Sequence, residues 1–206
     1  VLPSANQSAV LHAVMEDGKI VSGESKIPLY GKRIERVFLT PEDLRPLPET
    51  VKAIREADMI VIGPGSLFTS ILPNLVVPEL GEELARSRAT KVYICNLMTQ
   101  NGETNDFTAS DHVKAIYKHV EQLSIQKIVV NSGQIPENLK LRYKDEDASP
   151  VIIDRGNLEK MGLEVIAKPI VTFSGGVLRH DTKKLASLIY RMLINRKEDP
   201  FSCNNM

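Results

Sequence analysis

The chain has 206 residues with no formal net charge, and its content of 42% hydrophobic and 25% charged residues is ordinary for a globular α/β protein. A neutral chain creates no long-range attraction for nucleic acid, and its apolar runs are far shorter than the roughly 20 residues of a bilayer span. We therefore expect neither a nucleic-acid partner nor a membrane span. The two cysteines, Cys95 and Cys203, and the lack of a signal-peptide pattern in residues 1–8 favour a cytoplasmic protein over a secreted disulfide framework.

The first half of the chain predicts a hairpin followed by alternating strands and helices. Apolar runs flank Asp17-Gly18, a dipeptide that suits a tight turn between antiparallel strands. Two later runs are continuously apolar, which indicates strands buried on both faces of a parallel sheet. The periodicity predicts strands over 34–39, 58–63 and 91–98, and helices over 47–57 and 77–89.

The second half continues the alternation but contains a less regular segment. Residues 135–150 are charged and predict a looser connection, after which a short strand is expected at 151–154. The remaining expected elements are a polar loop over 99–111, a helix over 111–123, a strand over 125–133, an extended stretch over 164–171 and a terminal helix over 181–195. This order predicts one domain, 1–195, with a mostly parallel sheet covered by helices on both sides and the hairpin as an antiparallel excursion; residues 196–206 are expected to be a frayed tail.

The stretch "IGPGSLFTSILPNL", residues 62–75, predicts a ligand loop where a parallel strand ends. Gly63 and Gly65 let the backbone approach an anion, and Ser66, Thr69 and Ser70 add hydroxyl donors. The spacing matches neither the phosphate-binding P-loop nor the dinucleotide fingerprint, which disfavours a nicotinamide-dependent enzyme. The alternative is an ordinary strand-to-helix turn capped by Ser66.

A second polar stretch, residues 96–112, follows the next buried strand. Glu103 and Asp106 are residue types that hold Mg²⁺ through water or act as a general base, and His112 is a third candidate for catalysis. The alternative is structural, with Ser110 capping the following helix and Asp111 complementing its dipole.

The third polar element is "SGGVLRHD", residues 174–181, in which the small residues predict a flexible loop. Arg179 offers a planar guanidinium that suits a diphosphate, although the residues alone favour a structural pairing with Asp181 or another carboxylate. Tyr143, in the charged segment, offers a ring that can stack on a base. No catalytic triad order and no Cys/His metal spacing is present, so the residues by themselves indicate an anion-binding α/β domain.

Four stretches, "IGPGSLFTSILPNL", "YICNLMTQNGET", "TASDHVKAI" and "VLRHD", together resemble the 2-phospho-L-lactate transferase-like (CofD-like) family, in its bacterial branch of gluconeogenesis factors. The resemblance spans nearly the whole chain and implies a Rossmann-like three-layer α/β/α sandwich. It also implies a cytosolic regulator that binds UDP-N-acetylglucosamine or UDP-glucose and is linked to gluconeogenic growth, cell-envelope precursor supply and cell shape. Archaeal members transfer a phospholactyl group, so a Mg-dependent phosphotransferase is the alternative; a regulated protein partner and a homodimer are further expectations.

The resemblance also assigns residues. It implies that Tyr143 and Arg179 contact the nucleotide sugar. The nucleotide-proximal loop is implied to contain Gly63, Gly65, Ser66 and Asn74. The full expected ligand-binding set is Gly63, Gly65, Ser66, Thr69, Asn74, Asn96, Thr99, Tyr143 and Arg179.

Two departures from the family pattern bear on these assignments. The 206 residues do not include the glycine-rich βα unit that opens family members, so we expect either that this segment was omitted or that the chain is a fragment, and a large part of the phosphate site would be missing with it. The family often reads "GETDGYTASDH", whereas this chain has Asn105, Asp106 and Phe107, which moves the carboxylate by one position.

Overall fold

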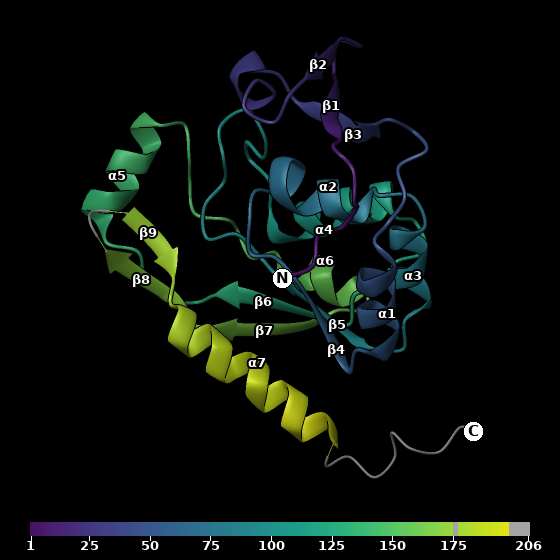
Figure 1. The fold of residues 1–206 in the computed structure, drawn as a ribbon. Helices are drawn as coiled ribbons and strands as arrows, with labels where there is room; N and C mark the ends of the chain where they lie inside the picture. The colour runs from purple at the N-terminus through teal and green to yellow at the C-terminus, as the bar shows by residue number, and fades with distance from the viewer. Residues whose placement is uncertain (175–176, 198–206) are drawn as a thin grey trace.

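A parallel sheet of four strands forms the centre of the computed structural model, which describes residues 1–174 and 177–197 (Figure 1). The strands lie in the order β4-β5-β6-β7, and each neighbouring pair is parallel. The predicted mixed α/β class with a mostly parallel sheet is confirmed. The strand bounds are β4 Met59–Ile62, β5 Thr90–Ile94, β6 Lys127–Asn131 and β7 Glu164–Lys168.

Side chains of the central strands alternate between two apolar layers, as the period of two along a strand requires. Val92 and Val129 face one side, where they pack with Leu185 of α7. Tyr93 and Ile128 face the other side and belong to the larger core. Figure 1 shows α7 below the sheet and α2, α4 and α6 above it; their bounds are α2 Leu72–Leu75, α4 Ala109–His119, α6 Arg155–Lys160 and α7 Thr182–Lys197.

The predicted amino-terminal hairpin is present and forms a separate antiparallel sheet in the order β2-β1-β3. Gly18 has a φ of 80°, the left-handed conformation that its turn requires. Leu11, Met15 and Val37 point into the larger core, so this sheet packs on the helices above the central strands. Its strands are β1 Val10–Met15, β2 Ile20–Ser22 and β3 Ile34–Thr40.

The remaining elements lie at the two ends of the central sheet. Helices α1, Pro48–Glu56, and α3, Leu80–Arg86, share an apolar cluster around Leu44 and Val77. At the other end, β8, Val171–Ser174, pairs with β9, Val177–His180, and leads directly into α7 (Figure 1). The loop predicted to be flexible, at Gly175 and Gly176, lies outside the described residues.

Three expectations from the sequence are wrong in detail. The charged segment contains a regular helix, α5, Glu137–Asp145, none of whose residues is fully buried, which explains its weak apolar pattern. Residues 151–154 do not form a strand, because Ile152 alone among them pairs, in an isolated bridge with Thr108, before α6 begins. Strand β4 is an edge strand, and its Val61 is 37% exposed, so it is not buried on both faces.

In the described part of the chain, no helix is long and apolar enough to cross a membrane.

Candidate functional site

A cavity of about 1020 Å³ lies where the polypeptide leaves β4 and β5, on the side where open parallel sheets bind their ligands. Its walls come from four segments that are far apart in sequence: the two loops that follow these strands, helix α5, and strand β9. The lining includes Gly65, Ser66, Asn96, Thr99, Gln100, Tyr143, Arg179 and His180.

The loop after β4 is shaped by Gly63 and a π-helical turn. Gly63 has a φ of 83°, and a Cβ there would lie 3.1 Å from the Ile94 carbonyl oxygen, so a side chain at this position would be both strained and crowded. The turn Leu67–Ile71 follows, and the carbonyl of Ser66 accepts hydrogen bonds from the amides of Ser70 and Ile71, both at 2.9 Å. Gly63 therefore permits the turn of the backbone after β4, while Gly65 and Ser66 line the cavity.

A relay of side chains ties the two loops together. The side-chain Nδ2 of Asn96 donates to Gln100 Oε1 at 3.3 Å, and Gln100 Nε2 donates to Ser66 Oγ at 2.8 Å. Because Ser66 Oγ accepts from Gln100, its own O–H remains available as a donor. Ser66 makes no capping bond to the turn that follows it, so the alternative of a helix cap is wrong. Gln100 is outside the expected ligand set; its signal in the sequence was its place in the polar run after β5.

Arg179 stands on β9 with an exposed guanidinium. No hydrogen bond or ion pair within residues 1–174 and 177–197 engages this side chain, and Asp181, its expected alternative partner, instead pairs with Lys184 at 3.3 Å. Tyr143 accepts a hydrogen bond from the Leu178 amide at 3.0 Å, which fixes α5 beside β9. The structure thus brings Ser66, Tyr143 and Arg179 to one cavity.

His180 is a lining residue that the sequence analysis did not select. Its Nε2–H donates to the carbonyl of Cys95 at 3.2 Å, and burial lowers the pKa of the ring below its ordinary value. The imidazole is therefore neutral at pH 7. Its signal was its position directly after Arg179 on the same short strand.

Besides Gly63, two further members of the expected ligand set lie outside the lining of this cavity. Thr69 is buried and donates to Glu103 Oε1 at 2.7 Å, while Glu103 Oε2 accepts from the Phe68 amide at 3.1 Å. Burial raises the pKa of Glu103, whose carboxyl group holds the π-helical turn against the loop after β5. Asn74 is exposed and donates to the Ser70 carbonyl at 2.8 Å. Neither Thr69 nor Asn74 lines the cavity.

The other catalytic candidates are also apart from the cavity. Asp106 is exposed at a positive φ of 59°. His112 is fully buried, its Nδ1–H donates to the Thr108 carbonyl at 2.8 Å, and burial lowers the pKa of the ring. Among the residues that the structure describes, no group of three or more His, Cys, Asp or Glu side chains is arranged to hold a metal ion. The Mg²⁺ expected for a transferase stays a prediction.

The start of α4 differs from its sequence-based description. The helix is capped by Thr108, whose side chain accepts from the Asp111 amide while the Asp111 carboxylate accepts from the Thr108 amide. Ser110 is already inside the helix, and its hydroxyl donates to Asp154 at 2.6 Å. The expected Ser110 cap is therefore wrong by two positions, because the helix begins earlier than the apolar stripe suggests.

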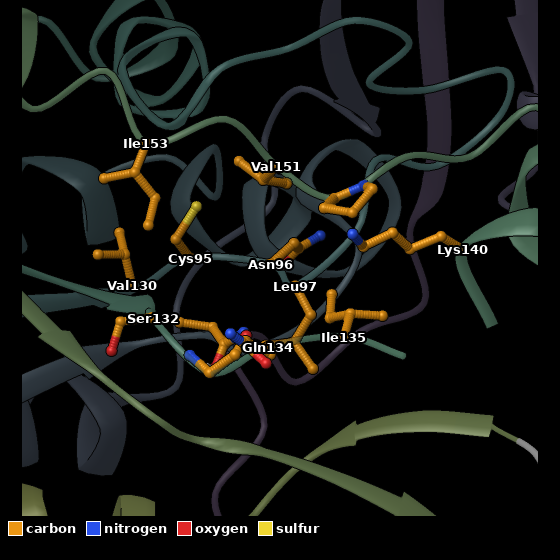
Figure 2. A pocket seen from close by; sticks show the side chains of 13 residues that line it. Cys95, Asn96, Leu97, Val130, Ser132, Gln134, Ile135, Lys140, Val151 and Ile153 are labelled. Atoms are coloured by element: carbon orange, nitrogen blue, oxygen red, sulfur yellow. Dashed lines mark hydrogen bonds between the residues drawn. The ribbon is translucent and has the colours of Figure 1, made fainter. Parts of the chain in front are cut away.

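A smaller cavity of about 380 Å³ lies beside the first, between the carboxyl ends of β5 and β6, and both are lined by Asn96 and Leu97 (Figure 2). In Figure 2 the Cys95 sulfur lies among apolar side chains, and the Lys140 amine points into the cavity. Burial raises the pKa of the Cys95 thiol to about 12, so it is protonated and a poor nucleophile.

Comparison with known families gives one match across most of the chain. The family described as 2-phospho-L-lactate transferase CofD matches residues 1–171.

Curated relatives carry a common name. The chain is 60% identical over 193 residues to the gluconeogenesis factor of Bacillus subtilis, covering 94% of this chain and 61% of that protein. It is 51% identical over 189 residues to the gluconeogenesis factor of Halalkalibacterium halodurans, covering 92% of this chain and 59% of that one. The chain thus spans about three fifths of the length of these relatives.

A solved structure has the same fold. A crystal structure of a Bacillus halodurans protein superposes with a TM-score of 0.89 at 51% identity, covering 92% of this chain and 61% of that one.

Proposed function

Because this chain belongs to the 2-phospho-L-lactate transferase CofD family, and its relatives are named gluconeogenesis factors, we propose that the cavity of about 1020 Å³ binds a UDP-sugar. The ligand is UDP-N-acetylglucosamine or UDP-glucose, and the protein acts as a regulator rather than as an enzyme. One observation carries the proposal: the guanidinium of Arg179, without a carboxylate partner among the described residues, lines the same cavity as the free hydroxyl donor of Ser66.

The chemistry of the two walls suits a diphosphate. A guanidinium binds phosphate oxygens through parallel charge-assisted hydrogen bonds, and the Ser66 hydroxyl adds a donor from the facing loop. Gly65 lets the backbone come close to the ligand. The apolar side chains of Leu97 and Met98, with the Tyr143 ring, provide surface for the uracil.

The positions of the candidate catalytic residues support a regulatory role. Glu103 and His112 are buried, with hydrogen bonds to Thr69 and to the Thr108 carbonyl, and neither lines the cavity. We propose that occupancy of the site by a cell-envelope precursor links gluconeogenic growth to control of cell shape, in a cytoplasmic protein.

Calorimetric titration of the chain with UDP-N-acetylglucosamine and with UDP-glucose tests the proposal. Arg179→Ala removes a charge-assisted contact of about 1.5–3 kcal/mol, so we expect an affinity roughly 10- to 150-fold weaker. Arg155→Ala is the matched control, because Arg155 is an exposed arginine on α6 that pairs with Glu159 and does not line the cavity. Equal affinity of the Arg179→Ala and unchanged proteins would refute the assignment, and turnover of a nucleotide-diphosphate donor with Mg²⁺ would favour the transferase alternative.

A further inference from the structure

A second groove, of about 410 Å³, lies between the end of β7 and the first turns of α7. Four cationic side chains line it: Lys168, Lys183, Lys184 and Arg191. Its remaining lining is small or apolar and includes Ile170 and Leu188. In a chain whose formal net charge is zero, this is a strong local excess of positive charge.

Most of these cations have no counter-charge among the residues that the structure describes. Lys184 pairs with Asp181 at 3.3 Å, but none of the hydrogen bonds or ion pairs of the described residues uses the side chains of Lys168, Lys183 or Arg191. All three are exposed. The groove therefore carries a positive charge that no ion pair within residues 1–174 and 177–197 fully neutralises.

The spacing of the cations favours an extended ligand over a compact anion. Lys184, Leu188 and Arg191 follow one another at intervals of four and three residues, so they lie on one stripe of α7. Seven residues of helix span about 10 Å, which is more than one phosphate group can bridge and matches about three residues of extended peptide. The amide of Lys184 is already occupied by the Asp181 carboxylate at 3.1 Å, so this donor is not available to a small anion.

Apolar side chains at the base of the groove offer a second kind of contact to a ligand, beside the cations. Ile170 is buried and Leu188 is half-buried, and both belong to the apolar layer beneath α7. An apolar side chain seated over them, with a carboxylate on either side reaching the cations, satisfies both the charge and the apolar surface.

We propose that this groove docks an acidic, extended segment of a partner protein, in which carboxylates flank an apolar residue. This groove and the cavity of about 1020 Å³ proposed to bind a UDP-sugar have no lining residue in common. The inference therefore goes beyond UDP-sugar binding and stands or falls separately from it.

Fluorescence anisotropy with a short labelled peptide, in which glutamates flank a leucine, tests the proposal. We expect saturable binding that weakens as salt is added, and much weaker binding of the same peptide with glutamine in place of glutamate. Lys168→Glu combined with Arg191→Glu reverses two exposed charges, so we expect affinity to fall about tenfold or more. Lys160→Glu is the matched control, because Lys160 is an exposed lysine at the end of α6, on the opposite side of the central sheet.

Several outcomes would overturn the proposal. Equal binding of the glutamine peptide, or undiminished binding by the doubly reversed variant, would remove the basis for charge recognition. Tripolyphosphate that binds the groove more tightly than the peptide would make it a small-anion site instead. Concentration-dependent self-association that the charge reversals abolish would make it an interface between copies of this chain. Circular dichroism melts establish whether the variants are folded. If the doubly reversed variant is unfolded, the variant Lys168→Gln with Arg191→Gln replaces it.

Discussion

Asp154 is the residue on which the start of α4 depends. Its carboxylate accepts from the amide and hydroxyl of Ser110, at 2.9 and 2.6 Å, and from the side chains of Thr108 and Asn157. These bonds hold the pKa of Asp154 at about 2, against an ordinary value of 3.8. They connect the first turn of α4 to the segment that leads into α6, and so fix two helices that cover the same face of the central sheet.

We expect Asp154→Asn to lower the free energy of unfolding by about 1–3 kcal/mol, because an amide group cannot accept all of these hydrogen bonds. The folded-state pKa lies below the unfolded value, so the contribution of the carboxylate is present above pH 3.8 and is lost as the pH falls toward about 2. Urea unfolding should therefore show the two proteins converging across that window. Asp106→Asn, at an exposed left-handed position that asparagine tolerates, is the control. A constant difference between Asp154→Asn and the unchanged protein would contradict the assignment.

The contrast between Thr69 and Arg179 shows what a single residue's chemistry conveys. Both are plausible phosphate ligands by residue type, yet Thr69 is buried against Glu103 while Arg179 is exposed beside a cavity. The difference depends on a buried carboxylate 34 residues away along the chain, and local sequence has no pattern for such a pairing. The sequence therefore predicts which residue types gather near the site. It does not predict which of these side chains are buried in internal hydrogen bonds and so cannot contact a ligand.

At the scale of elements, His119 joins the antiparallel sheet to α4. Its Nε2 accepts from the Val37 amide of β3 at 2.9 Å, and its Nδ1–H donates to the Ala115 carbonyl at 2.7 Å. The acceptor role of Nε2 requires the neutral ring, and burial lowers the pKa of His119, which favours that form. Protonation would place a proton on Nε2 and break the bond to β3.

We expect His119→Leu to destabilise the protein by about 1–3 kcal/mol at neutral pH, because the Val37 amide loses its acceptor. The folded-state pKa lies below the unfolded value of 6.5, so the ring's contribution is complete above pH 6.5 and falls as the pH drops through the folded-state pKa. Chemical unfolding at a series of pH values between about 7.5 and 5 should show the difference between variant and unchanged protein shrinking. A difference that does not vary with pH would mean that His119 contributes by packing rather than through the neutral ring.

Prediction of the elements from the sequence succeeded where the apolar pattern is strong. The buried strand β5 and the hairpin of β1 and β2 are both recognisable from their residues. Helix α5 was missed because it offers the core only partly buried side chains such as Tyr143. The edge position of β4 was missed because an apolar run does not reveal how many neighbours a strand has.

At the scale of the whole molecule, the candidate site is assembled from segments that meet only in the folded chain. The loop with Ser66 and the strand with Arg179 are more than a hundred residues apart, and α5 closes the wall between β5 and β9. The sequence indicated the convergence of the loops, because parallel strands place their carboxyl ends together. It did not indicate that the β8–β9 pair folds over that edge. This placement depends on contacts between residues far apart in sequence, such as the hydrogen bonds from the Leu178 amide to Tyr143 and from His180 to the Cys95 carbonyl.

This assembly predicts where a bound ligand changes the dynamics of the protein. The β8–β9 pair is a two-stranded ribbon, which opens more readily than the central sheet, and it carries Arg179 into the cavity. Saturating UDP-N-acetylglucosamine should therefore slow hydrogen exchange most strongly at the Leu178 amide and its strand partners. Amides of β1 and β3, which lie on the far side of the helices, should change much less (Figure 1). The measurement is amide exchange followed by mass spectrometry or NMR, with Arg179→Ala as the control in which the added protection disappears. Protection confined to β1 and β3 would place the ligand elsewhere, because a nucleotide sugar held by Arg179 has to restrain the ribbon that carries this side chain.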